Sequence, residues 1–366
     1  MTTRRPFIVL TLAVLAAASA TVAASGQTDP VGQPTRGQHQ LGHSLDPHWV
    51  PVNTGSDQQY RGLDAVNRRV AWVGGSDGEV LRTTNGGKTW KDVSPDDTTG
   101  LLFRDAEAHD ARHASVMAIG EGDASRIYTT DNGGKTWDLA FVNDEPTAFY
   151  DCMDFYPGGK RGLAMSDPVD GKFRILATYD GGHSWEVLPD DGMPDAVTGE
   201  FGFAASGTCL VIEGRDAWLA SGGGASRVFH SRDGGFNWTV ADSTIPADPA
   251  GGGVFSLAFR NSHVGLAVGG DFNAPDNGVD MSSRTRDGGA TWTAGGDLAG
   301  YRSGVDWLSR WLPVAIAVGP TGSDISYDGG RNWSAFDDTA YDAVVCTGDF
   351  ACWASGPDGS VARLAW

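Results

Sequence analysis

Thr83-Thr84-Asn85-Gly86-Gly87-Lys88-Thr89-Trp90 is the first of six copies of one octapeptide, which reads Ser/Thr-x-Asp/Asn-Gly-Gly-x-Ser/Thr/Asn-Trp. Asp-Gly and Asn-Gly favour tight hairpin turns, because glycine adopts positive φ without strain and the Asp or Asn side chain accepts backbone N–H groups. The closing tryptophan is expected to cover the turn and bury apolar area. We therefore assign a structural role to these turn motifs, whose Asp/Asn and Trp residues are Asn85, Asn132, Asp180, Asp233, Asp287, Asp328, Trp90, Trp137, Trp185, Trp238, Trp292 and Trp333.

The spacing of the motif indicates a repeat architecture. Successive closing tryptophans are 47, 48, 53, 54 and 41 residues apart. A period of about 40–50 residues with strand-like patterning is typical of one β-propeller blade per repeat. The composition agrees, since 52 of the 366 residues are glycine and only 20% are charged. Such a composition excludes a coiled coil or a long helical bundle.

A second element gives the number of blades. An aromatic residue followed by an apolar strand precedes each turn motif and occurs once more after the last one, at Tyr60, Phe103, Phe149, Phe201, Phe255, Tyr301 and Tyr341. The seventh repeat ends at Trp366 without a turn motif, so we expect residues 48–52 to supply its outer strand. The sequence therefore predicts an all-β, seven-bladed propeller over residues 47–366, closed so that no sheet edge is left free.

The N-terminal residues have the pattern of an export signal. Arg4 and Arg5 precede an apolar run over residues 7–18, and small residues follow it. This predicts a signal peptide over residues 1–24 and a polar linker over 25–46. A twin-arginine signal, an ordinary secretory signal and an uncleaved anchor all remain open. No later apolar run is long enough for a membrane span. From the signal we expect an exported bacterial protein, and we expect it to be a monomer.

The cysteine count permits two disulfides. Cys152, Cys209, Cys346 and Cys352 follow the signal, and an even number in an exported chain allows three pairings. Cys346 and Cys352 flank a predicted hairpin turn, which favours their pairing and leaves Cys152 for Cys209. Four free thiols are the alternative. The absence of Cys-x-x-Cys disfavours a zinc ribbon.

Charge and motifs exclude several functions. The formal net charge is −19, and an acidic chain repels nucleic-acid phosphates. No Gly-x-Gly-x-x-Gly sequence opens a helix, so no nucleotide cofactor and no redox enzyme are expected. Asp271, Asn273, Asp276 and Asp280 are the candidates for a Ca²⁺ site, but they lack the spacing of a helix-flanked calcium loop. We therefore predict neither a metal nor a cofactor.

The six turn motifs resemble the Asp-box, or BNR, repeat of sialidases and other propellers. Their frequency and the chain length are more similar to the exported photosystem II stability/assembly factor family and its bacterial relatives, which are often labelled oxidoreductase or glycosyl hydrolase. Residues 163–173, 202–209 and 319–324 add to this likeness. The resemblance implies a periplasmic or extracellular scaffold that binds a protein partner. Two features depart from it: the Arg-Ile-Pro motif of sialidases is absent, and the acidic composition differs from the basic surface expected of the assembly factors.

Three of the first strands begin with an aromatic residue and an arginine, at Arg61, Arg104 and Arg302. The first strand of a blade lines the channel, so these guanidiniums are predicted to gather near one mouth. There they would bind carboxylate or phosphate, with Tyr301 and Glu107 beside them. The alternative is that the arginines stabilise the ring by pairing with Asp64, Glu107 and Asp306.

Asp167, Glu200 and Asp271 lie on connections longer than a propeller needs. Paired carboxyl groups serve as acid and base in glycoside hydrolysis, which makes these residues weak catalytic candidates against the alternative of solvated loop acids. The sequence thus favours an exported binding or assembly scaffold for a protein partner, with a small anionic or sugar ligand as a further candidate. The alternative function is a sialidase-like or other glycoside hydrolase with arginines and carboxylates at the channel mouth.

Overall fold

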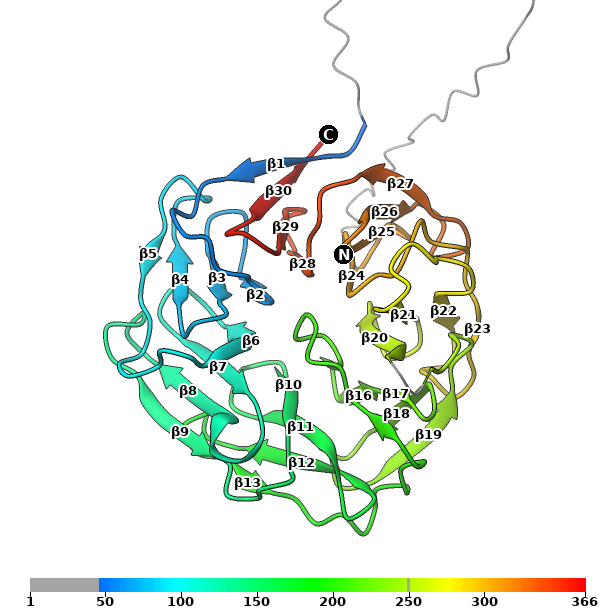
Figure 1. Ribbon diagram of the computed structural model, residues 1–366, viewed down its shortest axis with the longest axis horizontal. Coiled ribbons are helices and arrows are strands. Elements are labelled where there is room, and N and C mark those ends of the chain that lie inside the picture. The colour runs from blue at the N-terminus through cyan, green and yellow to red at the C-terminus, as the bar shows by residue number, and fades with distance from the viewer. Residues whose placement is uncertain (1–45, 249–250) are drawn as a thin grey trace, which may run out of the picture. The chain divides into compact units, whose positions relative to one another are not determined.

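Seven antiparallel sheets surround a common centre in the computed structural model, which describes residues 46–248 and 251–366 (Figure 1). Six of the sheets have four strands and one has six. Within the described residues there is no α-helix, and one 3₁₀ turn spans Gly122–Ala124. The predicted all-β, seven-bladed propeller is therefore confirmed. The predicted signal peptide and residues 25–45 of the predicted linker lie outside the described residues.

Each blade is a meander of four strands that runs from the centre of the ring outward. Blade 1 consists of β2 (Gly62–Ala65), β3 (Ala71–Gly74), β4 (Val80–Thr83) and β5 (Lys91–Asp92). Blade 2 consists of β6 (Leu102–Ala108), β7 (Ala114–Ile119), β8 (Arg126–Thr130) and β9 (Asp138–Val142). Blade 3 consists of β10 (Tyr150–Phe155), β11 (Gly162–Val169), β12 (Lys172–Thr178) and β13 (Glu186–Val187). Blade 4 is β15 (Leu210–Glu213), β16 (Asp216–Ala220), β18 (Arg227–Ser231) and β19 (Trp238–Asp242). Blades 5 and 6 are β20 (Gly252–Phe259), β21 (Gly265–Asp271), β22 (Ser282–Thr285) and β23 (Thr293–Ala294); and β24 (Gly304–Trp307), β25 (Ala315–Gly319), β26 (Gly322–Ser326) and β27 (Ser334–Asp337).

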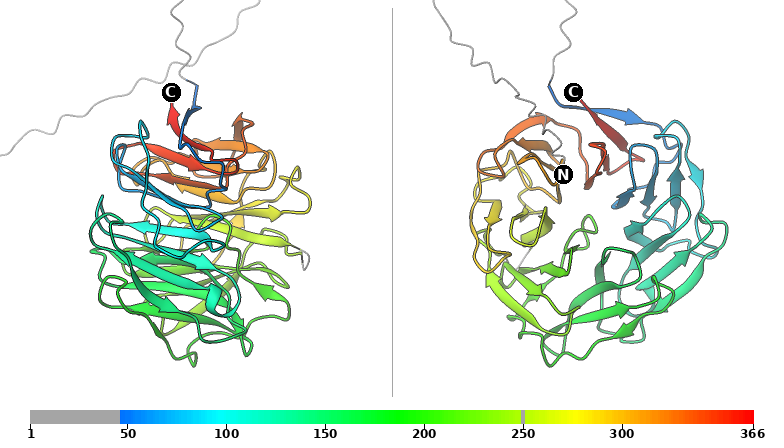
Figure 2. Two further views of the ribbon diagram at one scale, coloured as in Figure 1. Left: turned by 60° about the vertical axis from the view of Figure 1, so that its left-hand side comes forward. Right: turned by 180° about the vertical axis from the view of Figure 1, so that it is seen from behind.

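The ring is closed by strands from both ends of the described chain. Blade 7 consists of β28 (Ala343–Cys346), β29 (Cys352–Ser355), β30 (Val361–Ala365) and, as its outer strand, β1 (His48–Val52). β1 pairs antiparallel with β30 over its whole length, and the two lie side by side in Figures 1 and 2. The sequence predicted this closure, in which pairing of the first and last strands removes a free sheet edge.

The turn motifs share one hydrogen-bond pattern. In the first copy the Thr83 hydroxyl accepts the Gly87 N–H at 3.0 Å, and Asn85 Oδ1 accepts the Thr89 N–H at 3.0 Å. The last copy repeats it, with Ser326 accepting from Gly330 at 2.8 Å and Asp328 from Asn332 at 3.0 Å. Both glycines of every copy have positive φ, which is the conformation that Gly-Gly was expected to supply.

Side chains on the innermost strands join each blade to the next. Asp64 Oδ2 in blade 1 accepts the Ala108 N–H of blade 2 at 2.7 Å, and Asp306 Oδ2 in blade 6 accepts the Cys346 N–H of blade 7 at 2.7 Å. Three further pairs of neighbouring innermost strands are joined in the same way: Asp105 accepts the Met153 N–H, Asp154 accepts the Ile212 N–H, and the Ser256 hydroxyl accepts the Val305 N–H. An innermost strand has an edge without a strand partner, so these side chains satisfy backbone donors that would otherwise be buried and unpaired.

Both disulfides suggested by the sequence are present in the structure. Cys152 in β10 bonds to Cys209, the residue before β15, and this bond links blades 3 and 4. Cys346 and Cys352 close the β28–β29 hairpin. No described cysteine is a free thiol.

The buried acids that link the blades predict an unusual pH dependence of stability. Burial raises the pKa of Asp64 to about 6 and those of Asp154 and Asp306 to about 7, whereas an unfolded Asp titrates near 3.9. Between these values the native state binds more protons than the unfolded state, so stability increases as the pH falls from about 8 to about 5. We expect urea unfolding to give a free energy at least about 2 kcal/mol larger at pH 5 than at pH 8.

The control is Asp306→Asn, whose amide oxygen still accepts the Cys346 N–H and whose side chain no longer titrates. Because the Trp307 N–H loses its acceptor in this variant, the comparison is made on the slope of stability against pH and not on absolute stability. This variant should show a shallower pH dependence. At still lower pH the direction reverses, since hydrogen bonds from Thr291 lower the pKa of Asp287 and that stabilisation is lost as the carboxyl protonates. A wild-type stability that stays level or rises between pH 5 and pH 8 would contradict the argument.

Candidate functional site

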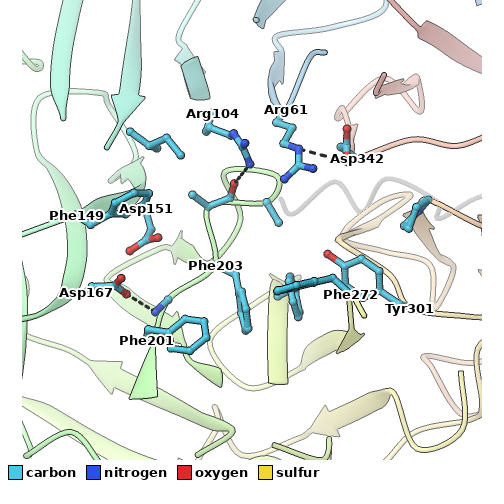
Figure 3. Close-up of a pocket in the computed structure, with 16 residues that line it drawn as sticks. Arg61, Arg104, Phe149, Asp151, Asp167, Phe201, Phe203, Phe272, Tyr301 and Asp342 are labelled. Carbon is cyan, nitrogen blue, oxygen red and sulfur yellow. Dashed lines mark hydrogen bonds and ion pairs between the residues drawn. The ribbon is translucent and has the colours of Figure 1, made fainter. Parts of the chain in front are cut away.

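A cavity of about 630 Å³ opens at one mouth of the ring, where the innermost strands begin (Figure 3). Its wall contains two guanidinium groups, three carboxyl groups and six aromatic rings. The volume falls in the range of ligand sites, roughly 300–1,000 Å³. We call this cavity the mouth pocket.

Residues 202–208 connect β14 (Glu200–Phe201) to Cys209, and residues 202–205 line the mouth pocket. Gly202 donates to Asp167 of blade 3. The segment also bonds three further blades: Arg104 of blade 2 donates to Ala204 O (3.1 Å), Ser206 donates to Ser303 O of blade 6 (2.7 Å), and the hydroxyls of Thr208 and Ser256 of blade 5 are hydrogen-bonded (2.6 Å). Because these blades lie on different sides of the ring, the segment crosses the centre. We call it the channel plug, because it closes the inner end of the mouth pocket.

One glycine allows the plug to approach blade 2. Gly207 has φ of +78°, and a Cβ at this position would lie 2.5 Å from Asp105 Oδ1. A larger residue would be strained and would displace the Asp105 carboxylate. β14 is held in place beside it, because it pairs with β17 (Gly222–Gly223), which in turn pairs with β20 of blade 5.

Arg61 and Arg104 come from neighbouring blades and lie side by side on one wall (Figure 3). Arg61 Nε lies 3.5 Å from Asp342 Oδ1, and Arg104 donates to Ala204 O at 3.1 Å. A guanidinium has five N–H donors, so most donors of this pair remain available to a ligand. Burial, and then repulsion by Arg61, lowers the pKa of Arg104 to about 10, which leaves it charged at neutral pH.

Asp151 and Asp167 form a second polar wall (Figure 3). Asp167 Oδ1 accepts the Gly202 N–H at 2.6 Å, whereas Asp151 Oδ2 is buried without a hydrogen-bond partner among the described residues. Burial raises the pKa of Asp167 to about 6. Burial, followed by repulsion from Asp167, raises the pKa of Asp151 well above its usual range. These carboxyls therefore retain protons to higher pH than ordinary acids.

The remaining wall is aromatic. Phe203 stacks on Phe255 with ring centroids 3.6 Å apart, and Phe255 contacts Tyr301 at 4.7 Å and Phe272 at 6.5 Å. Phe201 packs edge-on against Phe203 at 5.0 Å. These contacts fix the rings in place, so the wall offers a rigid apolar surface beside the arginine pair.

The structure brings Arg61, Arg104 and Tyr301 to the mouth pocket, but the prediction for Arg302 was wrong. Arg302 is fully buried, and its Nε donates to Asp324 Oδ2 at 2.7 Å. Its Nη1 donates to the Thr321 hydroxyl at 2.8 Å. Asp324 lies on β26, so the guanidinium turns into its own blade to reach a carboxylate instead of facing the channel.

The interpretation of Glu107 also needs correction. Glu107 does not line the mouth pocket; it lies farther along β6, where burial and then the charges of Asp154 and Asp64 raise its pKa well above the usual range. The alternative ion pairs were wrong as well. Arg61 approaches Asp342, while Asp64 and Asp306 accept backbone N–H groups between blades.

Of the three weak catalytic candidates, only Asp167 lies in the mouth pocket. Glu200 is buried in a bidentate ion pair with Arg227 and accepts the Ser221 hydroxyl at 2.5 Å. Asp271 ends β21 and accepts the Asn273 N–H at 2.8 Å. Across residues 46–248 and 251–366, no group of three or more His, Cys, Asp or Glu side chains is placed to hold a metal ion.

Asp151, Asp342 and the phenylalanines of the aromatic wall were not predicted from the sequence. Tyr341-Asp342 occupies the same place before a first strand as Tyr60-Arg61. Asp151 lies at the register shift of β10 as Arg104 lies at that of β6, so the sequence alignment at Phe149 was one residue out of register. The aromatic wall had no signal in the repeat, because the plug that contributes Phe203 occurs in one blade only.

Comparison with solved structures identifies the fold. YCF48 bound to a D1 peptide superposes with a TM-score of 0.63 and 14% identity, covering 89% of this chain and 97% of that one. YCF48 from Cyanidioschyzon merolae superposes with a TM-score of 0.58 and 16% identity, covering 86% of this chain and 98% of that one. An ancestral GH74 enzyme superposes with a TM-score of 0.58 and 15% identity, covering 85% of this chain and 45% of the enzyme. At the level of the fold this confirms the resemblance drawn from the turn motifs.

No protein-family model and no curated protein matches the chain. None of the helical structure in the described part of the chain is long and apolar enough to cross a membrane.

The environment of Arg302 predicts a structural role that separates it from Arg61. Arg302→Ala should lower the free energy of unfolding by about 3–5 kcal/mol, because it leaves Asp324 buried without its partner. Arg61→Ala should cost less than about 1 kcal/mol, since Arg61 is partly exposed and its ion pair is long. Urea denaturation measures both values.

The Arg302→Ala, Asp324→Ala double variant provides the control. It should be less destabilised than the sum of its two single variants, because no unpaired buried charge remains. Additive losses, or an Arg61→Ala loss equal to that of Arg302→Ala, would refute this assignment.

Proposed function

We propose that the chain is an exported binding scaffold whose mouth pocket takes a short segment of a protein partner, with an acidic group placed on Arg61 and Arg104. The observation that carries the proposal is the arginine pair, whose donors are largely unused although both groups line a pocket. Guanidinium forks bind carboxylates through two parallel hydrogen bonds, which gives both affinity and orientation.

The aromatic wall favours a peptide over a bare anion. Phe203 and Phe272 lie across the pocket from the arginines (Figure 3), and Phe255 stacks on Phe203. An apolar side chain next to the acidic group would be buried against these rings. The preformed plug and the aromatic contacts mean that little ordering is needed on binding, and this improves affinity. YCF48, which shares the fold, binds a D1 peptide, and this supports peptide binding by the present chain.

Asp151 and Asp167 support a second candidate function, glycoside hydrolysis. They lie side by side in one pocket (Figure 3), and their raised pKa values suit an acid that retains its proton. Paired carboxyls of this kind act as acid and base, or acid and nucleophile, on glycosides. In this alternative Asp151 is the second catalytic carboxyl group, the role for which the sequence suggested Glu200 or Asp271. Asp167→Asn should then abolish hydrolysis without weakening peptide binding.

Short peptides that carry a free C-terminal carboxylate after Leu or Phe test the proposed function, with the same peptides amidated as the comparison. We expect calorimetric binding of the acids, a loss of at least about tenfold on amidation, and a similar loss in Arg61→Gln and Arg104→Gln.

Arg112→Gln is the control for this experiment, because Arg112 is exposed and lies outside the mouth pocket. It should bind as the wild type does. If the acid and amide forms bind equally well, or if Arg104→Gln retains full affinity, the arginine pair is not the recognition element. Release of sugar from a panel of aryl glycosides by the wild type, lost in Asp167→Asn, would favour the hydrolase instead.

A further inference from the structure

A second group of arginines lies away from the mouth pocket, in a groove of about 670 Å³ between blades 5 and 6. Arg260 follows β20 and Arg284 lies in β22, and both are half-buried. Arg286 and Arg331 belong to the fifth and sixth turn motifs, and both are exposed. The groove therefore has two guanidiniums in its base and two on its rim.

These four arginines lack carboxylate partners. All the arginine ion pairs within the described residues involve other arginines. The one carboxylate that lines the groove, Asp328, is occupied in its own turn by the N–H groups of Arg331 and Asn332. Four arginines and a single carboxylate thus share one groove, which leaves it with a net positive charge in a chain whose formal net charge is −19.

Much of their hydrogen-bonding capacity is also unused. Arg260 Nε is buried and has no hydrogen-bond partner, although the guanidinium lies 5.1 Å from the centre of the Trp307 ring. Arg284 and Arg331 each donate to one backbone carbonyl, at 3.4 and 2.9 Å. Partial burial, and then repulsion by Arg331 and Arg286, lowers the pKa of Arg284. Like charges held together in this way are stabilised by a bound anion.

The repeat provides an internal comparison, because the corresponding groove between blades 3 and 4 also contains arginines. There Arg232 is paired with Asp216 at 3.2 Å, and Arg161 stacks over Tyr156 at 5.0 Å. In blade 1 Arg82 covers Trp72 at 5.2 Å and donates to the Ala111 carbonyl. An arginine over an aromatic ring thus recurs in the repeat. The groove between blades 3 and 4 has three arginines with Arg232 in an ion pair, whereas the groove between blades 5 and 6 has four arginines and no arginine ion pair.

We propose that this groove binds a tetrahedral dianion, either free phosphate or sulfate or the phosphate group of a monoester. Several guanidinium forks around one site match a tetrahedral group with oxygens on every side, whereas a carboxylate offers two oxygens and one charge. The strongly acidic remainder of the surface opposes the approach of extended polyanions, so the ligand is a compact one. The site is independent of the mouth pocket and of the function proposed for it.

Calorimetric titration of the full chain with sodium sulfate and sodium phosphate at pH 7.5 tests this site, with sodium acetate at equal ionic strength as the reference. We expect saturable binding of one sulfate or phosphate and no comparable binding of acetate. Arg286→Gln removes one rim charge from a side chain with no intramolecular hydrogen bond, so it should leave folding intact and weaken binding about tenfold.

Arg215→Gln is the matched control, because Arg215 is an exposed arginine in the groove between blades 3 and 4. It should change the affinity less than about twofold, since exposed charges far from a site are screened at physiological salt. An equal loss in both variants, or acetate binding as tight as that of sulfate, would overturn the proposal. Phenyl phosphate, a dianionic monoester, identifies the source: an affinity equal to that of free phosphate assigns an ester group, and a weaker one assigns the free anion. Peptide binding at the mouth pocket should be unchanged in Arg286→Gln, so the two proposals succeed or fail separately.

Discussion

The innermost strand of a propeller blade has one edge with no strand to pair with, and this structure depends on how that edge is satisfied. Aspartates in blades 1, 2, 3 and 6 and a serine in blade 5 accept a backbone N–H from the next innermost strand. Between blades 7 and 1 the Ser355 hydroxyl donates to Tyr60 O at 3.0 Å. Each of these bonds joins two blades and also satisfies a buried polar group, and such groups are costly to leave unpaired.

These bonds determine which acids are available for function. In Asp64 both carboxylate oxygens accept a backbone N–H, from Ala65 and Ala108, so the backbone holds the carboxylate in place. Raised pKa values therefore mark two kinds of acid in this ring. Burial raises the pKa values of Asp64, Asp154 and Asp306, whose oxygens accept the backbone N–H groups that link blades, whereas Asp151 has a buried oxygen without a partner among the described residues. A raised pKa alone would not distinguish them, and the hydrogen-bond partners do.

The fold was predictable from the sequence because it rests on local, repeated chemistry. The Gly-Gly turns require positive φ in every copy, and the missing outer strand of the last blade could be counted from seven first strands and six turns. The site was predictable only in part. Arg61, Arg104 and Arg302 occupy the same place in the repeat, but Asp324 on a different strand draws Arg302 away from the channel. The plug arises from one non-repeated connection, so its role depends on contacts with three distant blades that no local pattern encodes.

The distribution of charge connects the two proposed sites. A chain with a formal net charge of −19 has 27 Lys and Arg residues, and most of the arginines that form ion pairs support turns or neighbouring strands. The mouth pocket and the groove between blades 5 and 6 both leave guanidiniums with unused donors. Unpaired like charges destabilise a fold unless a ligand offsets them, so their concentration in two hollows of an acidic ring is better explained by binding than by stability. The two hollows differ in their surroundings. Aromatic rings beside Arg61 and Arg104 suit an acid with an apolar neighbour, whereas the four arginines of the groove suit a compact group with more than one charge.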